Sequence, residues 1–238
     1  MKRALFAAVS LLALSCAASA QQMDEESLRA LILQTIRDNP EVIMEAIETL
    51  QAQEAEAQAA AAAAALTAQM GALQNDPNAP VLGNPDGDIT VVEFFDYNCG
   101  YCRRVFPNVK ALMEEDTNIR VVMREWPILG EESVFAARAS LASRKQGKYE
   151  EFHNALMGAN GRASQAVVLS IADDLGMDID QLRADMESPE VDAHINTSRQ
   201  LTQALGVNGT PAFVFEDQLV PGAIELEQMK QLVEELRG

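Results

Sequence analysis

Two cysteines three positions apart are the most reactive side chains of this sequence. Cys99 and Cys102 form a C-x-x-C pair, and the only other cysteine of the 238-residue chain is Cys16. The spacing is typical of half a zinc site or of a pair that exchanges disulfide bonds. Three cysteines are too few for an all-cysteine zinc site in one chain or for a disulfide-held scaffold.

A zinc site would need two further ligands, and the histidines are poor candidates. His153 follows Phe152 in a helical pattern, and His194 falls within another predicted helix. Histidines in such positions are interpreted as packing or surface residues. We therefore predict no structural metal site and no cofactor.

The position of the pair favours redox chemistry. Residues 89–95 (ITVVEFF) predict a buried strand, and a helix is expected to begin at Cys99 and run to about residue 115. The free N–H groups and the dipole of a helix N-terminus stabilise a thiolate. The spacing lets Cys102 return along the same helical face to attack a mixed disulfide. Gly100 leaves the approach to the pair open.

The elements around this pair predict an α/β fold. Residues 119–126 (IRVVMREW) form a second strand, which completes a β-α-β unit. Residues 131–205 contain several helical patterns. Two short strands, at 212–215 and about 219–220, and a helix at 225–236 complete the expected order.

The region before residue 75 has a different pattern, with apolar side chains at helical spacing. Pro40 separates two predicted helices, and the second carries apolar or small residues at alternating spacings of four and three, which we call the heptad seam. The seam consists of Ile43, Ile47, Leu50, Glu54, Ala57, Ala61, Ala64, Ala68 and Gly71. We expect self-association through its early part, and docking onto the catalytic domain is the alternative.

The N-terminus has the pattern of a secretory signal. Lys2 and Arg3 precede an apolar run, and Ala18-Ser19-Ala20 predicts cleavage after Ala20. Lipidation at Cys16 is an alternative. The protein is therefore expected in the periplasm, where disulfides form readily. Its formal charge of −18 argues against nucleic acid or an anionic membrane as main partner.

The motif itself resembles a known family. Residues 93–102 (EFFDYNCGYC) are similar to the active site of the DsbA-like branch of the thioredoxin superfamily, and the resemblance extends over about residues 81–238. It implies a thioredoxin fold with a helical insertion. It also implies a cis bond between Thr210 and Pro211 that faces the cysteines, and a buried proton-transferring acid at Glu93.

The resemblance also bears on the direction of exchange. Gly100-Tyr101 between the cysteines and Thr210 before Pro211 look like the oligomeric disulfide isomerases. Residues 39–46 (NPEVIMEA) resemble the N-terminal region of the suppressor-of-copper-sensitivity C proteins, whose relatives include trimers. A DsbA-type dithiol oxidase remains an alternative. Cu(I) binding by the two thiolates is an alternative from another class.

These observations predict a periplasmic thiol-disulfide oxidoreductase that favours isomerisation. Cys99 is expected to be the nucleophile and Cys102 the resolving thiol, with Thr210 and Pro211 shaping the cleft. The expected partners are unfolded or misoxidised exported proteins, a membrane redox partner and further copies of the chain, with a trimer favoured. The predicted domains are a signal peptide at 1–20, a helical stalk and linker at 21–75, and a catalytic domain at 76–238 with its insertion at about 131–205.

Overall fold

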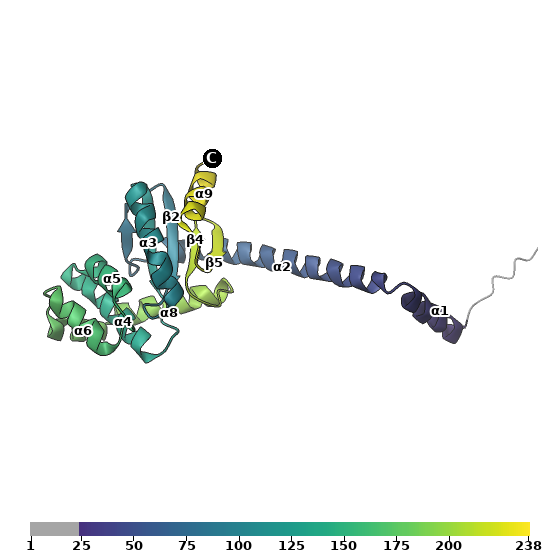
Figure 1. Ribbon diagram of the computed structural model, residues 1–238, viewed down its shortest axis with the longest axis horizontal. Helices are drawn as coiled ribbons and strands as arrows, with labels where there is room; N and C mark the ends of the chain where they lie inside the picture. Colours follow the sequence, from purple (N-terminus) through teal and green to yellow (C-terminus); the bar gives the residue numbers. More distant parts are fainter. Residues whose placement is uncertain (1–23) are drawn as a thin grey trace, which may run out of the picture. The chain divides into compact units, whose positions relative to one another are not determined.

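The computed structural model describes residues 24–238 (Figure 1). The predicted signal peptide and Cys16 lie outside the described residues. The chain forms two compact units, which divide between Ala55 and Glu56.

Two helices make up the described part of the first unit. α1 (Glu25–Asp38) begins after Asp24, whose side chain accepts the Ser27 N–H at 2.8 Å. α2 (Glu41–Gln74) begins after Pro40 and continues into the second unit. The large apolar side chains of this part are 36–58% exposed, and they are Leu28, Leu31, Ile32, Leu33, Ile36, Val42, Ile43, Met44, Ile47 and Leu50.

The last turns of α2 pack into the second unit through a different face from the heptad seam. Leu66 and Leu73 are buried against Val92 and Phe94. Every position of the heptad seam, from Ile43 to Gly71, is exposed. The second compact unit begins at Glu56, because the end of α2 contributes to its core.

A five-stranded sheet forms the centre of the second unit. Its order is β1-β3-β2-β4-β5, with only the β2–β3 pair parallel. The strands are β1 (Val81–Gly83), β2 (Ile89–Phe95), β3 (Ile119–Glu125), β4 (Ala212–Phe215) and β5 (Gln218–Pro221). The four predicted strands are confirmed. β1 was not predicted, because three residues carry too short a pattern.

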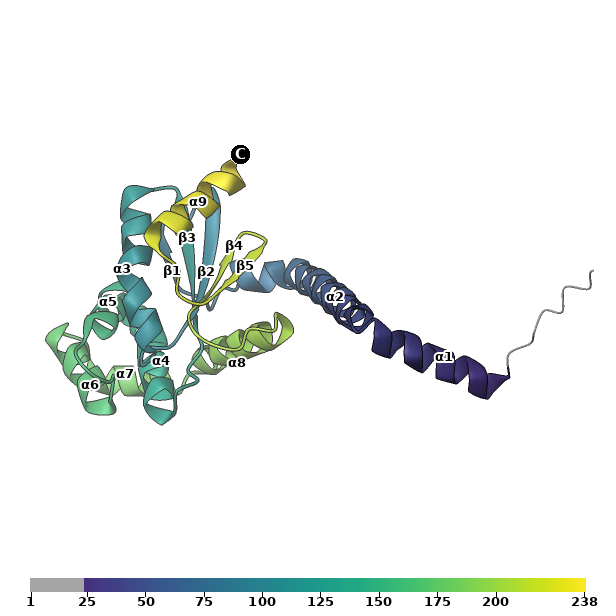
Figure 2. The same ribbon diagram turned by 45° about the vertical axis from the view of Figure 1, so that its right-hand side comes forward.

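Helices cover both faces of the sheet (Figures 1 and 2). α3 (Gly100–Glu115) and α9 (Leu226–Arg237) pack on the face that carries Val91 and Phe95. α8 (Pro189–Ala204) packs with the end of α2 on the face that carries Val92 and Phe94. β2 is buried along its whole length, as expected for a strand covered on both faces.

The helical insertion is confirmed between β3 and β4. It contains α4 (Glu131–Ser143), a short 3₁₀ turn (Arg144–Gln146), α5 (Tyr149–Gly158), α6 (Gln165–Asp174), α7 (Ile179–Met186) and α8. α7 begins after Asp178, which accepts the Gln181 N–H at 2.9 Å. Within residues 24–238, no helix is both long and apolar enough to cross a membrane.

Candidate active site

The two cysteines lie where β2 gives way to α3. Cys99 is the residue before the first turn of α3, and its N–H donates to the Asp96 carbonyl at 3.0 Å. We call residues 96–99 the redox turn. Because β2 and β3 are parallel, the redox turn and the loop after β3 (residues 126–130) emerge at the same edge of the sheet. The sequence therefore places the pair at a helix start, as predicted.

Cys99 has the environment of a stabilised thiolate. The residue is 6% exposed, and its thiol Sγ–H donates to the Thr210 carbonyl at 3.2 Å. A hydrogen bond with the Cys102 thiol, together with one from the Thr210 side chain and those from the first N–H groups of α3, lowers the pKa of Cys99 to about 5, against the opposing effect of burial. At neutral pH the sulfur is therefore ionised.

Cys102 has the opposite electrostatic character. It is fully buried in the first turn of α3. Burial raises the pKa of Cys102 well above its usual range, and the hydrogen bond with Cys99 and the charge of Glu93 raise it further. The pair therefore consists of an ionised sulfur just before α3 and a protonated thiol in the first turn of that helix.

Glu93 is a carboxyl group inside the sheet. It lies in the middle of β2 on the same face as Val91 and Phe95, and it is 2% exposed. Burial raises the pKa of Glu93 to about 8, and its Oε1 has no hydrogen-bond partner. The structure brings this carboxyl within electrostatic reach of Cys102.

The loop before β4 closes the site on its other side. The Thr210–Pro211 peptide bond is cis, as the resemblance implied. The Pro211 carbonyl accepts the Gly222 N–H at 2.9 Å, and the Thr210 carbonyl faces Cys99. Thr210 therefore contacts the sulfur of Cys99, although the two residues are 111 positions apart in the sequence.

The dipeptide between the cysteines is open to the outside. A side chain at Gly100 would meet no atom within 4 Å. Tyr101 is 59% exposed, and the Arg104 guanidinium lies 5.0 Å from its ring centroid. Arg103 instead anchors α3 to the insertion, since it donates to the Tyr97 carbonyl at 2.8 Å and to the Ala159 carbonyl at 2.9 Å.

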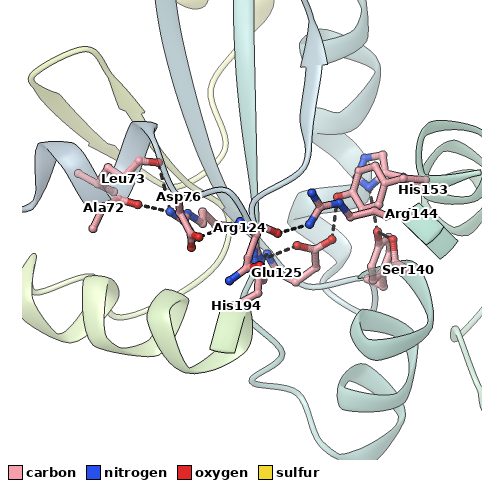
Figure 3. A network of polar contacts seen from close by, with 12 residues as sticks. Ala72, Leu73, Asp76, Arg124, Glu125, Ser140, Arg144, His153 and His194 are labelled. Atoms are coloured by element: carbon pink, nitrogen blue, oxygen red, sulfur yellow. Dashed lines mark hydrogen bonds and ion pairs between the residues drawn. The ribbon is translucent and has the colours of Figure 1, made fainter. Parts of the chain in front are cut away.

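A buried polar network beside the site was not predicted from the sequence. The Tyr97 hydroxyl contacts Ser140 Oγ at 2.6 Å and His153 Nδ1 at 2.9 Å. Four rings surround His153, and burial lowers its pKa to about 4, so it is neutral at pH 7. These contacts join Tyr97 to α4 and α5 of the helical insertion, and Ser140 and His153 are labelled in Figure 3.

The same region contains buried charged groups on β3. Glu125 accepts a hydrogen bond from Tyr149 at 2.7 Å and pairs with His194 Nε2 at 2.8 Å. Arg124 pairs with Asp76 at 2.7 Å and donates to the carbonyls of Ala72 and Leu73, at the end of α2 (Figure 3). Both histidines therefore have structural partners. Among the described residues, no group of three or more His, Cys, Asp or Glu side chains could hold a metal ion.

A C-x-x-C pair that opens the helix of a β-α-β unit is typical of the thioredoxin-fold class. The DSBA-like thioredoxin domain family matches residues 90–234, more than half of the chain, so the chain belongs to this family. The copper resistance protein ScsC N-terminal domain matches residues 24–57. The chain thus combines a DsbA-like thioredoxin domain with an N-terminal region of the ScsC kind.

Solved structures of similar proteins cover either the second unit or nearly the whole chain. A thioredoxin-like oxidoreductase from Silicibacter pomeroyi DSS-3 is 61% identical, with a TM-score of 0.69 over 70% of this chain and 96% of that chain. Proteus mirabilis ScsC in a compact conformation is 30% identical, with a TM-score of 0.64 over 90% of this chain and 98% of that chain.

The first curated relatives are much longer proteins. The Na(+)/H(+) antiporter NhaA 1 of Salinispora arenicola (strain CNS-205) is 30% identical over 155 residues, which cover 64% of this chain and 24% of the antiporter. The chain spans about a quarter of the length of the curated relatives it matches first.

Proposed function

We propose that this protein exchanges disulfide bonds with exported protein substrates, and that it favours isomerisation. The observation that carries the proposal is the contrast within the pair: the pKa of Cys99 is lowered to about 5, whereas that of Cys102 is raised. A low pKa supplies thiolate at neutral pH and also makes Cys99 a good leaving group. Repeated exchange needs both an attacking thiolate and a sulfur that leaves readily.

The Cys99 thiolate attacks one sulfur of a substrate disulfide. A bond forms between Cys99 and that sulfur, the substrate disulfide breaks, and the second substrate sulfur leaves as a thiolate. In isomerisation, another substrate thiolate then attacks the mixed disulfide and displaces Cys99. The substrate gains a new bridge, and no net electrons are transferred.

Cys102 resolves a mixed disulfide that does not rearrange. Its sulfur attacks Cys99, forms the Cys99–Cys102 disulfide and releases the substrate thiolate, so that two electrons pass to the substrate. The buried thiol must first lose its proton, and the proposed acceptor is the ionised form of Glu93, which is the minor form at neutral pH because burial raises the pKa of Glu93 to about 8. A membrane redox partner would then reduce the pair. Run backwards, the same steps oxidise a dithiol substrate.

The surface around the redox turn and the segment after β3 suits an unfolded substrate. Within residues 56–238 the large apolar side chains that remain exposed are Tyr101, Ile128, Leu129 and Val134. All four follow the redox turn or lie in the segment after β3. An extended apolar segment could cover them while the backbone near Thr210 aligns its cysteine with Cys99.

Self-association through the first unit would place several pairs around one substrate. The exposed apolar residues of α1 and α2, the open heptad seam and the match to the ScsC N-terminal domain support this proposal. The resemblance described above favours a trimer. We further propose periplasmic localisation, with residues 1–20 as signal, 21–75 as stalk and linker, and 76–238 as the catalytic domain.

The test compares two reactions of the full mature chain. Reactivation of a scrambled-disulfide enzyme is measured beside oxidation of the same enzyme in its reduced form, with Cys99→Ser as control. We expect rescue of the scrambled enzyme by wild type and none by the variant. Fast oxidation without any rescue would favour the dithiol oxidase instead.

A further inference from the structure

The Asp96 carboxylate joins the redox turn to the loop after β3. Its Oδ1 accepts the Asn98 N–H at 2.7 Å, and its Oδ2 accepts the N–H groups of Ile128 at 2.8 Å and Leu129 at 3.0 Å. The residue is 2% exposed. A buried carboxylate is costly unless its oxygens are hydrogen-bonded, and here three backbone donors satisfy it.

The same residue also holds the cysteine. The Asp96 carbonyl accepts the Cys99 N–H at 3.0 Å, so one residue contacts the nucleophile through its main chain and residues 128–129 through its side chain. Ile128 and Leu129, which we call the apolar lip, are 41% and 43% exposed. The two hydrogen bonds from Asp96 hold the backbone of this partly exposed segment.

The rest of the redox turn is held independently of Asp96. Asn98 accepts the Ala163 N–H at 2.8 Å and donates to Ser133 Oγ at 3.2 Å. Arg103 holds the Tyr97 carbonyl. Loss of the Asp96 carboxylate should therefore release the apolar lip while the turn and Cys99 stay in place.

We propose that Asp96 is a positioning residue for substrate binding, which fixes the apolar lip beside Cys99 and so favours substrates with apolar residues next to their cysteine. This inference rests on the proposed thiol-disulfide exchange. Asp96 does not touch the reacting sulfurs, and its effect is expected in KM rather than in the reactivity of Cys99.

The test uses Asp96→Asn and Asp96→Ser in the full chain. A serine hydroxyl still accepts the Asn98 N–H within the turn but is too short to reach the loop, so this variant keeps the turn if the amide does not fold well. The matched control is Asp116→Asn, because Asp116 accepts the Asn118 N–H at 3.0 Å in a similar turn before β3.

Three rates are measured: exchange with a disulfide peptide bearing apolar flanking residues, exchange with a polar-flanked peptide of the same length, and alkylation of Cys99 by iodoacetamide. For both Asp96 variants we expect KM for the apolar peptide to rise about tenfold, with kcat and the alkylation rate unchanged, as loss of about 1.4 kcal/mol of binding predicts. The polar peptide and the Asp116 variant should match wild type. Amide exchange at Ile128 and Leu129 should become faster in the Asp96 variants alone.

If the exchange rates with both peptides and the alkylation rate fall equally, Asp96 determines the reactivity of Cys99 itself. If KM keeps its wild-type value in both variants, the apolar lip does not depend on Asp96 for its position. Either result overturns the inference and leaves the proposed function intact. Wild-type protein that exchanges with neither peptide would instead overturn the proposed function.

Discussion

The two units differ in the exposure of their large apolar side chains. In the described part of the first unit, large apolar residues are exposed along both helices, whereas in residues 56–238 nearly all of them are buried. The second unit has its own sheet, two cores and a complete cysteine environment. The part of the first unit that the structure describes has no buried residue, and such an exposed apolar surface favours coverage by another copy or another surface.

The second unit carries the thiol chemistry, whereas the first unit carries the surface proposed for assembly. A single second unit contains every contact that lowers the pKa of Cys99. Isomerisation of a large substrate would additionally use the association of several units. Substitutions in either unit should therefore affect the chemistry and the assembly separately.

Cys99→Ser should abolish exchange, with a loss of at least about a thousandfold, because the hydroxyl is neither ionised nor redox-active at neutral pH. Cys102→Ser should instead keep the first attack and accumulate mixed disulfides with substrate, since resolution is lost. Non-reducing gel electrophoresis and mass spectrometry detect these adducts. Adducts that form on Cys102 in the Cys99 variant would reverse the assigned roles.

Leu73→Ala and Leu50→Ala make the same change at two places on α2. Leu73 is fully buried in the second unit, and Leu50 is 58% exposed. We expect the first to lower the free energy of unfolding by about 3 kcal/mol through lost burial and a cavity, and the second to change it by less than about 0.5 kcal/mol. Urea unfolding followed by Trp126 fluorescence, the single tryptophan, reports on this unit. Equal effects would contradict the division at residues 55–56.

Ile43→Asp combined with Ile47→Asp places two charges on the heptad seam. If the seam associates, the dissociation constant should rise about a hundredfold or more, corresponding to about 2.7 kcal/mol, because apolar contacts are replaced by buried like charges. Thr49→Asp with Ala52→Asp is the control off the seam. Light scattering on the mature protein measures the subunit number. An unchanged mass for the seam variant would exclude association through this face.

Glu93→Gln tests the buried carboxyl. Because the folded pKa of Glu93 is raised to about 8 from an ordinary 4.5, the folded state still holds, between pH 5 and 8, a proton that the unfolded state has largely released. Wild type should lose about 2 kcal/mol or more of stability over this interval relative to Glu93→Gln. Urea unfolding at both pH values checks the difference. Parallel pH dependence of the two proteins would place the carboxyl in contact with water.

The sequence could predict the parts of the fold that repeat a pattern. Continuous apolar runs predicted β2 and β3, helical periodicity predicted the insertion, and the position of Cys99 before α3 followed from the order of elements. It could not predict which face of α2 packs on the sheet. Leu66 and Leu73 do so, and the more regular heptad seam does not.

The site was only partly predictable for a related reason. The cysteines, Glu93 and Thr210 belong to recognisable motifs. Asp96 acts through backbone groups 32 and 33 positions away, and Glu125 meets His194 across 69 positions. Such contacts arise from the tertiary arrangement of strands and helices. The available local signals, an acid at a strand end and only two histidines in the chain, do not indicate their partners.

The fold makes Cys99 a thiolate at neutral pH. The direct test is the rate of iodoacetamide alkylation of the reduced full chain as a function of pH, with the modified residue identified by mass spectrometry. The structure predicts a half-maximal rate near pH 5, on Cys99 alone, because the pKa of Cys99 is lowered to about 5 by the Cys102 thiol, Thr210 and the N–H groups of α3. A rate that continues to rise until about pH 9, the ordinary cysteine pKa, would contradict the account.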